Sequence, residues 1–198
     1  MTIDFKTLAE TMTVLNLNLR APSGSTNTLL LRDADTKTLT VLNSFTISSG
    51  GALQVTNSSL LLPSGSLTVN GSLQLDSGTV TVNGGLETGR GGSGSITIHG
   101  GSLVVTQELN MGFGSADTAT LVMNGGQLIV TNGPTFITGS GTAAIIVSNG
   151  LFAAKDVVMG TGGGGPRQGS LTVAGGSVTI SGFMSAGHSV AIGGESPL

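Results

Sequence analysis

Glu108 and Asp156 are the two carboxylates whose spacing is relevant to chemistry. Each stands just before an apolar-x-apolar unit, and Thr135 occupies the equivalent place between them. In stacked parallel strands they would lie two coils apart, at about 9.6 Å by the strand spacing, near the upper limit for an inverting glycosidase. Lys155 is the one basic neighbour, and no aromatic sugar platform accompanies the pair. We therefore predict no catalytic residues and no enzyme activity.

Histidine and cysteine usage excludes other kinds of site. His99 and His188 fall in different parts of the pattern, one in a turn and one in a variable loop. The chain has no cysteine, which excludes thiol catalysis and Cys-based zinc sites. A nucleophilic triad is not expected, and both histidines are interpreted as turn residues.

Three glycine- or aspartate-containing segments resemble ligand-binding motifs incompletely. Residues 160–165 match G-x-G-x-x-G, but a strand follows where the dinucleotide motif requires a helix. Asp33 and Asp35 begin like a calcium loop, yet Lys37 stands where a third ligand belongs. Residues 91–94 start like a calcium-binding nonapeptide, but isoleucine replaces its aspartate. We predict no cofactor and no metal.

The composition is unlike that of an ordinary globular enzyme. Of 198 residues, 9% are charged, against roughly 25% in ordinary domains, and 34 are glycine. The 38% of hydrophobic residues argue against disorder. The net charge of -3, with scattered basic residues, makes nucleic acid a poor partner. No apolar stretch is long enough for a spanning helix, and the start has no secretory signal pattern.

An internal repeat explains this composition. Seven copies follow one another at spacings of 24, 20, 23, 25, 24 and 26 residues, and a shortened eighth begins at Ser189. The copies start at Thr28, Ala52, Ser72, Ser95, Thr120, Ala144 and Ser170.

Each copy contains three apolar-x-apolar units, the period of a strand with one buried face. The fifth and sixth copies illustrate the predicted inward pairs, which are Leu121/Met123, Leu128/Val130 and Phe136/Thr138, then Ile145/Val147, Leu151/Ala153 and Val157/Met159. The sequence therefore predicts an all-β, right-handed parallel β-helix (β-solenoid) with three short strands per coil of about 24 residues. A left-handed hexapeptide helix would require a strict period of six.

The two ends of the chain differ from the repeat. Residues 1–27 are predicted to form an N-terminal cap, with a helix from Asp4 to Met12 and a strand from Val14 to Leu19. Residues 28–198 are predicted to form the solenoid of seven coils plus a partial eighth. Residues 191–194 lie in mid-coil, so we expect the natural protein to continue.

The repeats resemble those of autotransporter (type V secretion) passenger domains and PEP-CTERM-associated surface proteins. The likeness lies in residues 78–85, 94–101, 158–165 and 169–176, and extends over about 45–194. It implies a structural or adhesive segment of an exported protein, at the bacterial cell surface or outside the cell. Expected partners are another copy, other segments of the full-length protein, or a surface glycan or host ligand. The alternatives are a carbohydrate-active β-helix fragment and a trimeric phage-fibre segment.

The outward centres of the strands predict an interaction surface on the coils of residues 95–169. Val104, Ile129 and Phe152 are predicted to form one apolar strip on the second strands. The first strands add Val122 and Ile146, and the third strands add Ile137 and Val158. The alternative is that the loop of residues 160–169 covers part of this surface.

Overall fold

The computed structural model describes residues 2–4, 11–32, 38–137, 140–160 and 168–186, and these contain strands but no helix. No described segment is a helix long and apolar enough to cross a membrane. The motif positions 33–37 and 161–165, His188 and the partial copy at Ser189 lie outside the described residues.

The strands form three parallel faces, because each strand pairs with its equivalent in the next coil. Face 1 contains β1 (Thr2–Asp4), β3 (Asn27–Arg32), β5 (Gly51–Thr56), β8 (Ser72–Leu75), β11 (Ser93–Ile98), the first parts of β14 (Thr118–Ile137) and β15 (Thr142–Met159), and β16 (Gln168–Val173). Face 2 contains the first parts of β2 (Met12–Leu19) and β4 (Thr38–Ile47), then β6 (Ser58–Leu62), β9 (Gly78–Val82), β12 (Ser102–Val105), the middle of β14 and β15, and β17 (Ser177–Ile180). Face 3 contains the ends of β2 and β4, β7 (Ser66–Val69), β10 (Leu86–Thr88), β13 (Leu109–Met111), the ends of β14 and β15, and β18 (Met184–Ala186).

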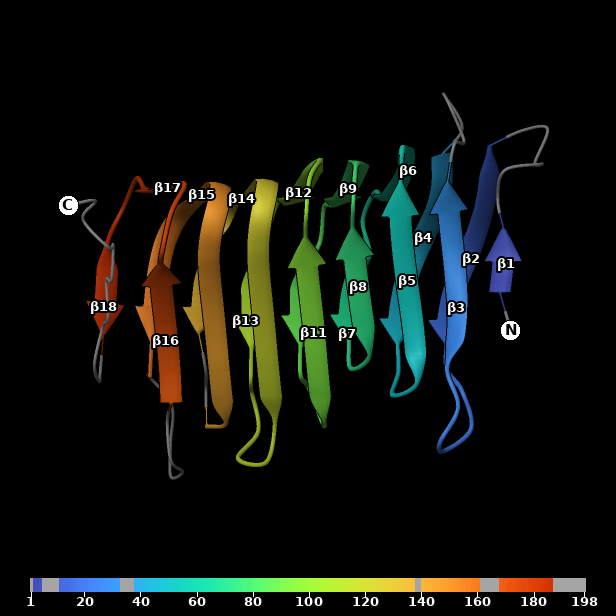
Figure 1. Ribbon diagram of the computed structural model, residues 1–198, viewed down its shortest axis with the longest axis horizontal. Coiled ribbons are helices and arrows are strands. Elements are labelled where there is room, and N and C mark those ends of the chain that lie inside the picture. Colours follow the sequence, from blue (N-terminus) through green and yellow to red (C-terminus); the bar gives the residue numbers. More distant parts are fainter. Residues whose placement is uncertain (1, 5–10, 33–37, 138–139, 161–167, 187–198) are drawn as a thin grey trace.

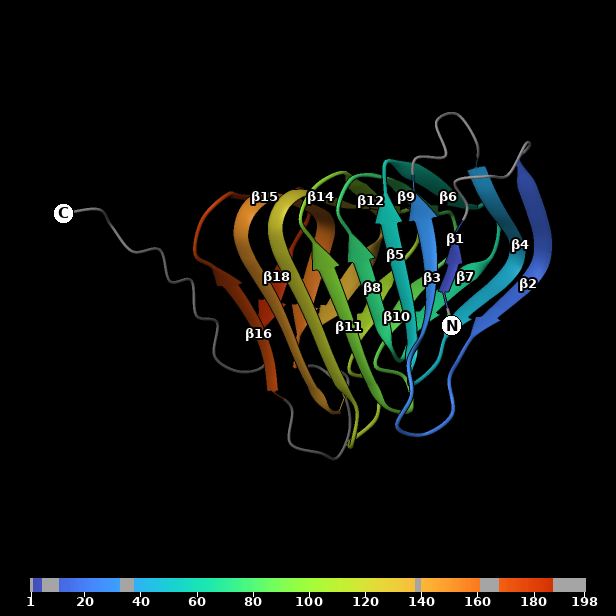
Figure 2. The ribbon, with the colours of Figure 1, turned by 45° about the vertical axis from the view of Figure 1, so that its right-hand side comes forward.

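The winding is right-handed. Face 1 runs upward at the front, and the chain then crosses the top and descends behind while the coils advance from right to left (Figure 1). The turned view shows the coils as stacked rings around a common interior (Figure 2). The predicted β-solenoid is confirmed.

Inward side chains stack in register to form the core. On face 1 the first members of the predicted pairs form one buried ladder, which is Leu29, Leu53, Leu73, Ile96, Leu121, Ile145 and Leu171. Neighbouring strands are roughly 4.8 Å apart, so each side chain contacts its equivalents above and below. The face 1 assignments made from sequence are therefore confirmed.

The segment 1–27 differs from its predicted form. β1 pairs with β3, and β2 pairs with β4 from Met12 to Leu19, so the described part supplies the strands of one further coil. The strand predicted from Val14 to Leu19 is confirmed. The helix is wrong at Met12, which begins β2, and residues 5–10 lie outside the described part. The period-two pairs Met12/Val14 and Leu17/Leu19 are in register with the inward residues of β4. This pairing outweighs the local helical spacing.

Two threonines occupy buried core positions without a hydrogen-bond partner for their hydroxyls. Thr88 is 1% exposed, and Thr135 is fully buried on the same face. Neither Oγ1 has a partner among the described residues. A buried hydroxyl without a partner destabilises the fold.

We predict that Thr135→Val raises the stability by about 1 kcal/mol, because valine fills the same space without an unsatisfied hydroxyl. For a chain of this size that corresponds to roughly 2–4 °C in the melting temperature, measured by calorimetry. Thr97→Val, at an outward and half-buried position, is the control and is expected to change little. A lower melting temperature for Thr135→Val would contradict the assignment.

Candidate interaction surface

On face 2, two of the predicted surface residues lie side by side. Val104 of β12 is in register with Ile129 of β14, and both are half-buried and face outward. Ile129 is followed by Ala153 in β15 and then by Thr179 in β17. The predicted strip is therefore confirmed for Val104 and Ile129. Its third place is occupied by the small residue Ala153 and not by Phe152.

Phe152 is in the core, so its prediction as a surface residue is wrong. Its side chain is 0% exposed and lies in register with Leu128 and Val178. The inward residues of this part of β15 are Phe152 and Ala154, not Leu151 and Ala153. Phenylalanine buries a large apolar area, which this register places inside.

The corner glycines contain the signal that identifies the correct register. Gly126 and Gly150 both have positive φ, at +65° and +92°, and a Cβ on Gly150 would lie 2.4 Å from the Gly126 carbonyl oxygen. The inward strand position is always the second residue after this glycine, as with Leu128 and Phe152. Counting from the glycine, and not from the first apolar residue, places Phe152 inside.

Ile137 is also in the core, so its prediction as a surface residue is wrong too. Thr135 and Ile137 are fully buried, and Phe136 faces outward beside Val158 of β15. Val158 keeps its predicted outward place, although it is only 8% exposed. The alternative pairs, Thr135/Ile137 and Phe136/Thr138, each put one apolar residue and one threonine inward, so the apolar pattern alone could not separate them.

Face 1 agrees with the prediction. Val122 and Ile146 are in register, face outward and are half-buried, between Thr97 and Thr172 of the neighbouring coils.

Together the outward apolar residues of the three faces form what we call the apolar girdle, defined as Val122, Ile146, Val104, Ile129, Ala153, Phe136 and Val158. The girdle surrounds the coils of β14 and β15 and extends to β12 on face 2. Its members are less exposed than Leu15 and Phe113, at 62% and 59%.

Glu108 and Asp156 lie in one column two coils apart, with Pro134 and not the predicted Thr135 between them. Each carboxylate has its own local partner. Glu108 Oε1 accepts a hydrogen bond from the Asn110 amide at 3.0 Å, and Asp156 Oδ1 accepts one from the Phe183 backbone N–H at 2.9 Å. The two groups are thus held by different contacts. Within the described ranges, no three or more potential metal-ligating side chains gather.

A polar network that the sequence did not reveal links three coils across face 1. Asp76 Oδ2 accepts hydrogen bonds from Gln54 Nε2 at 2.8 Å and from Thr56 Oγ1 at 3.1 Å. Asp76 Oδ1 accepts from Gln74 Nε2 at 2.7 Å and pairs with His99 Nδ1 at 2.9 Å. The available signal was the register, since Asp76 and His99 directly follow the paired residues Leu75 and Ile98.

The loops between faces 3 and 1 contain a second carboxylate that links coils. Asp117 is 7% exposed and accepts backbone N–H groups of Gly91, Gly92 and Gly114 at 3.1, 2.9 and 2.6 Å. This joins the loop before β11 to the loop after β13. In the second loop Phe113 is exposed beneath the Arg90 guanidinium, which lies 5.8 Å from the ring centroid.

Comparisons of the chain with models of known families, with curated proteins and with solved structures found no match. What the chain does must therefore be inferred from its own residues.

The Asp76 network predicts a loss of stability in acid. Burial raises the pKa of Asp76, but hydrogen bonds from Gln54, Gln74, His99 and Thr56 together lower it to about 2 from 3.8. Because the pKa is lower in the folded chain, the ionised carboxylate stabilises the fold fully above pH 3.8, and this contribution is lost as the pH falls toward 2.

We expect Asp76→Asn to be less stable than the parent at pH 7 and to lose less stability between pH 5 and 2, measured by urea unfolding across that range. Glu87→Gln, which removes a carboxylate from an ion pair with the exposed Arg90, is the matched control and should keep the acid dependence of the parent. Identical pH profiles for the parent and Asp76→Asn would contradict the role of the network.

Proposed function

We propose that this chain is a structural or adhesive repeat segment of an exported bacterial surface protein. The solenoid is the rigid scaffold, and the apolar girdle is the surface that contacts another copy or another segment of the full-length protein. The proposal places the chain at the cell surface or outside the cell.

The observation that supports a scaffold role is the uninterrupted core. Every coil repeats the same inward ladders, and side chains from Leu29 to Leu171 are buried in one cluster. Each coil is hydrogen-bonded to its neighbours along three faces. Such a structure resists bending, because a bend would open ladder hydrogen bonds on one side and compress packed side chains on the other.

The observation that supports a contact role is the change in outward residues along the rod. On face 2 the outward place is Thr81 before the girdle and Thr179 after it, whereas Val104 and Ile129 occupy the places between. On face 1, Thr97 and Thr172 border Val122 and Ile146 in the same way. Contiguous apolar residues on a solvated sheet mark interaction surfaces.

The alternative of a carbohydrate-active fragment gains no support from Glu108 and Asp156. Their separate hydrogen bonds to Asn110 and to the Phe183 backbone hold them in local structural roles. We therefore keep the scaffold role as the proposal.

The proposal is tested by replacing Val104 and Ile129 together with threonine, which keeps strand propensity while removing apolar area. We expect self-association, measured as mass by light scattering over a concentration series, to weaken roughly 10-fold or more. Replacing Thr40 and Thr81 with serine on the same face is the control and should leave the mass unchanged. A parent that is monomeric throughout, with equally low apolar-dye binding in both proteins, would contradict the role of the girdle.

A further inference from the structure

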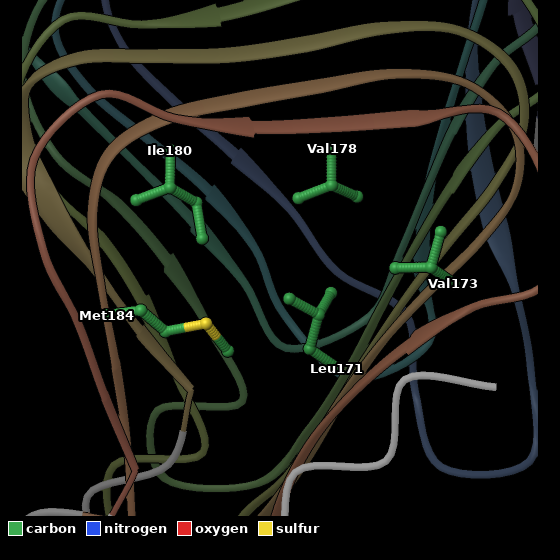
Figure 3. A pocket seen from close by; sticks show the side chains of 5 residues that line it. All are labelled: Leu171, Val173, Val178, Ile180 and Met184. Carbon is green, nitrogen blue, oxygen red and sulfur yellow. The ribbon is translucent and has the colours of Figure 1, made fainter.

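The corners of the solenoid carry the chain from one face to the next, outside the packed interior. In the β16–β18 coil, side chains from all three faces point into one interior, and the chain turns between Val173 and Val178 (Figure 3). Five corners of the solenoid contain an asparagine that is followed directly by glycine. These pairs are Asn70-Gly71, Asn83-Gly84, Asn124-Gly125, Asn132-Gly133 and Asn149-Gly150.

An asparagine followed by glycine contains both partners of an intramolecular reaction. The backbone nitrogen of the glycine is the nucleophile, and the side-chain carboxamide of the asparagine is the group that it attacks. Glycine has no Cβ to obstruct the approach, and the ring that closes has five atoms. The rate in a folded protein depends on how the two groups are held, because reaction requires their proximity and correct orientation.

At Asn149 the two groups are held together. The backbone N–H of Gly150 donates a hydrogen bond to Oδ1 of Asn149 at 2.8 Å, so the nitrogen lies beside the carboxamide that it would attack. Gly150 has a φ of +92°, a conformation that glycine adopts without a steric penalty. Asn149 is exposed, so water and base can reach the corner.

Two of the other asparagines are held by neighbouring coils. Asn70 Nδ2 donates to the Arg90 carbonyl oxygen at 2.8 Å, and Asn70 Oδ1 accepts the Arg90 backbone N–H at 2.7 Å. Asn83 Nδ2 donates to the Pro63 carbonyl oxygen at 3.2 Å, and Asn83 Oδ1 accepts from Thr106 Oγ1 at 3.1 Å. These side chains cannot turn toward the following glycine without losing both hydrogen bonds.

At two corners the glycine nitrogen is itself engaged. The Gly84 N–H donates to the Gly65 carbonyl oxygen, and the Gly133 N–H donates to the Gln107 carbonyl oxygen, both at 3.2 Å. A nitrogen that donates to the preceding coil is directed away from its own asparagine.

The pair at Asn124 is the closest comparison with Asn149. Both asparagines are exposed, and they are partners in the pairing of β14 with β15. Among the five pairs, in the hydrogen bonds of the described residues, Gly150 alone donates its N–H to the side chain of the preceding asparagine. The corner of β15 therefore has the arrangement best suited to the reaction.

We propose that Asn149 is a site of spontaneous deamidation. The Gly150 nitrogen forms a bond to Asn149 Cγ, the bond from Cγ to Nδ2 breaks, and the proton of the Gly150 N–H leaves with the amide as ammonia. The product is a five-membered succinimide. Water then opens this ring at Cγ, which gives aspartate, or at the main-chain carbonyl carbon, which gives isoaspartate. One water is consumed and one ammonia is released, with no oxidation or reduction.

Both products change the corner that joins the face 1 and face 2 parts of β15. Each adds one negative charge to a chain whose net charge is -3. Isoaspartate also routes the main chain through Cβ and Cγ, which adds one backbone atom between two segments of β15 that are paired with β14. The modification does not depend on the role proposed for the girdle.

The experiment ages the folded protein, and the same protein unfolded in urea, at one mildly alkaline pH. Mass spectrometry of peptides then locates each replacement of an amide by an acid. Cleavage after phenylalanine separates residues 137–152, in which Asn149 is the single asparagine, from residues 114–136, which contain Asn124 and Asn132. Asn149→Gln is the matched control, because it keeps a carboxamide but would have to close a larger ring.

In the folded protein we expect Asn149 to react roughly 10-fold or more faster than Asn70 and Asn83, and also faster than Asn124. Its peptide should contain both aspartate and isoaspartate, which chromatography separates. In the unfolded chain the five asparagines should react at similar rates, because each is followed by glycine. The peptide of residues 137–152 from Asn149→Gln should stay unmodified.

Three results would overturn the proposal. They are equal rates at the five asparagines in the folded protein, modification that appears first at another asparagine, and a folded protein in which Asn149 stays intact while the unfolded chain reacts. Failure of the girdle test would change none of these outcomes, since the readout is a covalent change and not an association.

Discussion

The stacking of each inward side chain on its equivalent in the next coil is the interaction on which the whole structure depends. A single coil buries little apolar area, so Leu121 is fully buried only because Ile96 and Ile145 lie on either side of it. The backbone hydrogen bonds between coils require the same alignment. Faces, corners and outward surfaces all follow from this register.

The polar groups between coils follow the register as well. Asp76 receives hydrogen bonds from Gln54 of the preceding coil and from His99 of the following coil, and Asp117 joins two successive loops. Gln54 and His99 are each more than twenty residues from Asp76 in the sequence, yet they lie next to it in space. They stabilise the stack from outside, while the apolar ladders stabilise it from within.

Much of this could be predicted from sequence, because the period-two pairs repeat with little variation. The assignments failed where an apolar residue stands next to the inward position and makes two registers look alike. At Phe152 the apolar pattern predicts Leu151 as the first inward residue after the corner, although Gly150 with its positive φ sets the count. At Ile137 both registers bury one threonine, so only the pairing with β15 decides between them. The predicted helix is wrong at Met12 because helical spacing there coincides with a strand pair, and the pairing with β4 decided the outcome.

The outward surface changed accordingly, since a shift of one residue exchanges the two faces of a strand. Phe152 and Ile137 of the predicted surface are in the core, and the girdle contains Ala153 and Phe136 in their places. The network around Asp76 was missed for another reason. Its members are ordinary turn and strand residues, and only the three-dimensional stack brings them together.

The register of β15 tests this account most directly. The chain has no cysteine, so single cysteines placed at Leu151, Phe152 and Ala153 can be labelled one at a time with a thiol reagent. We expect slow labelling at 152, which is fully buried, and fast labelling at 151 and 153, which are half-buried and face outward. Fast labelling at 152 with protection at 151 and 153, in variants that remain folded, would contradict it.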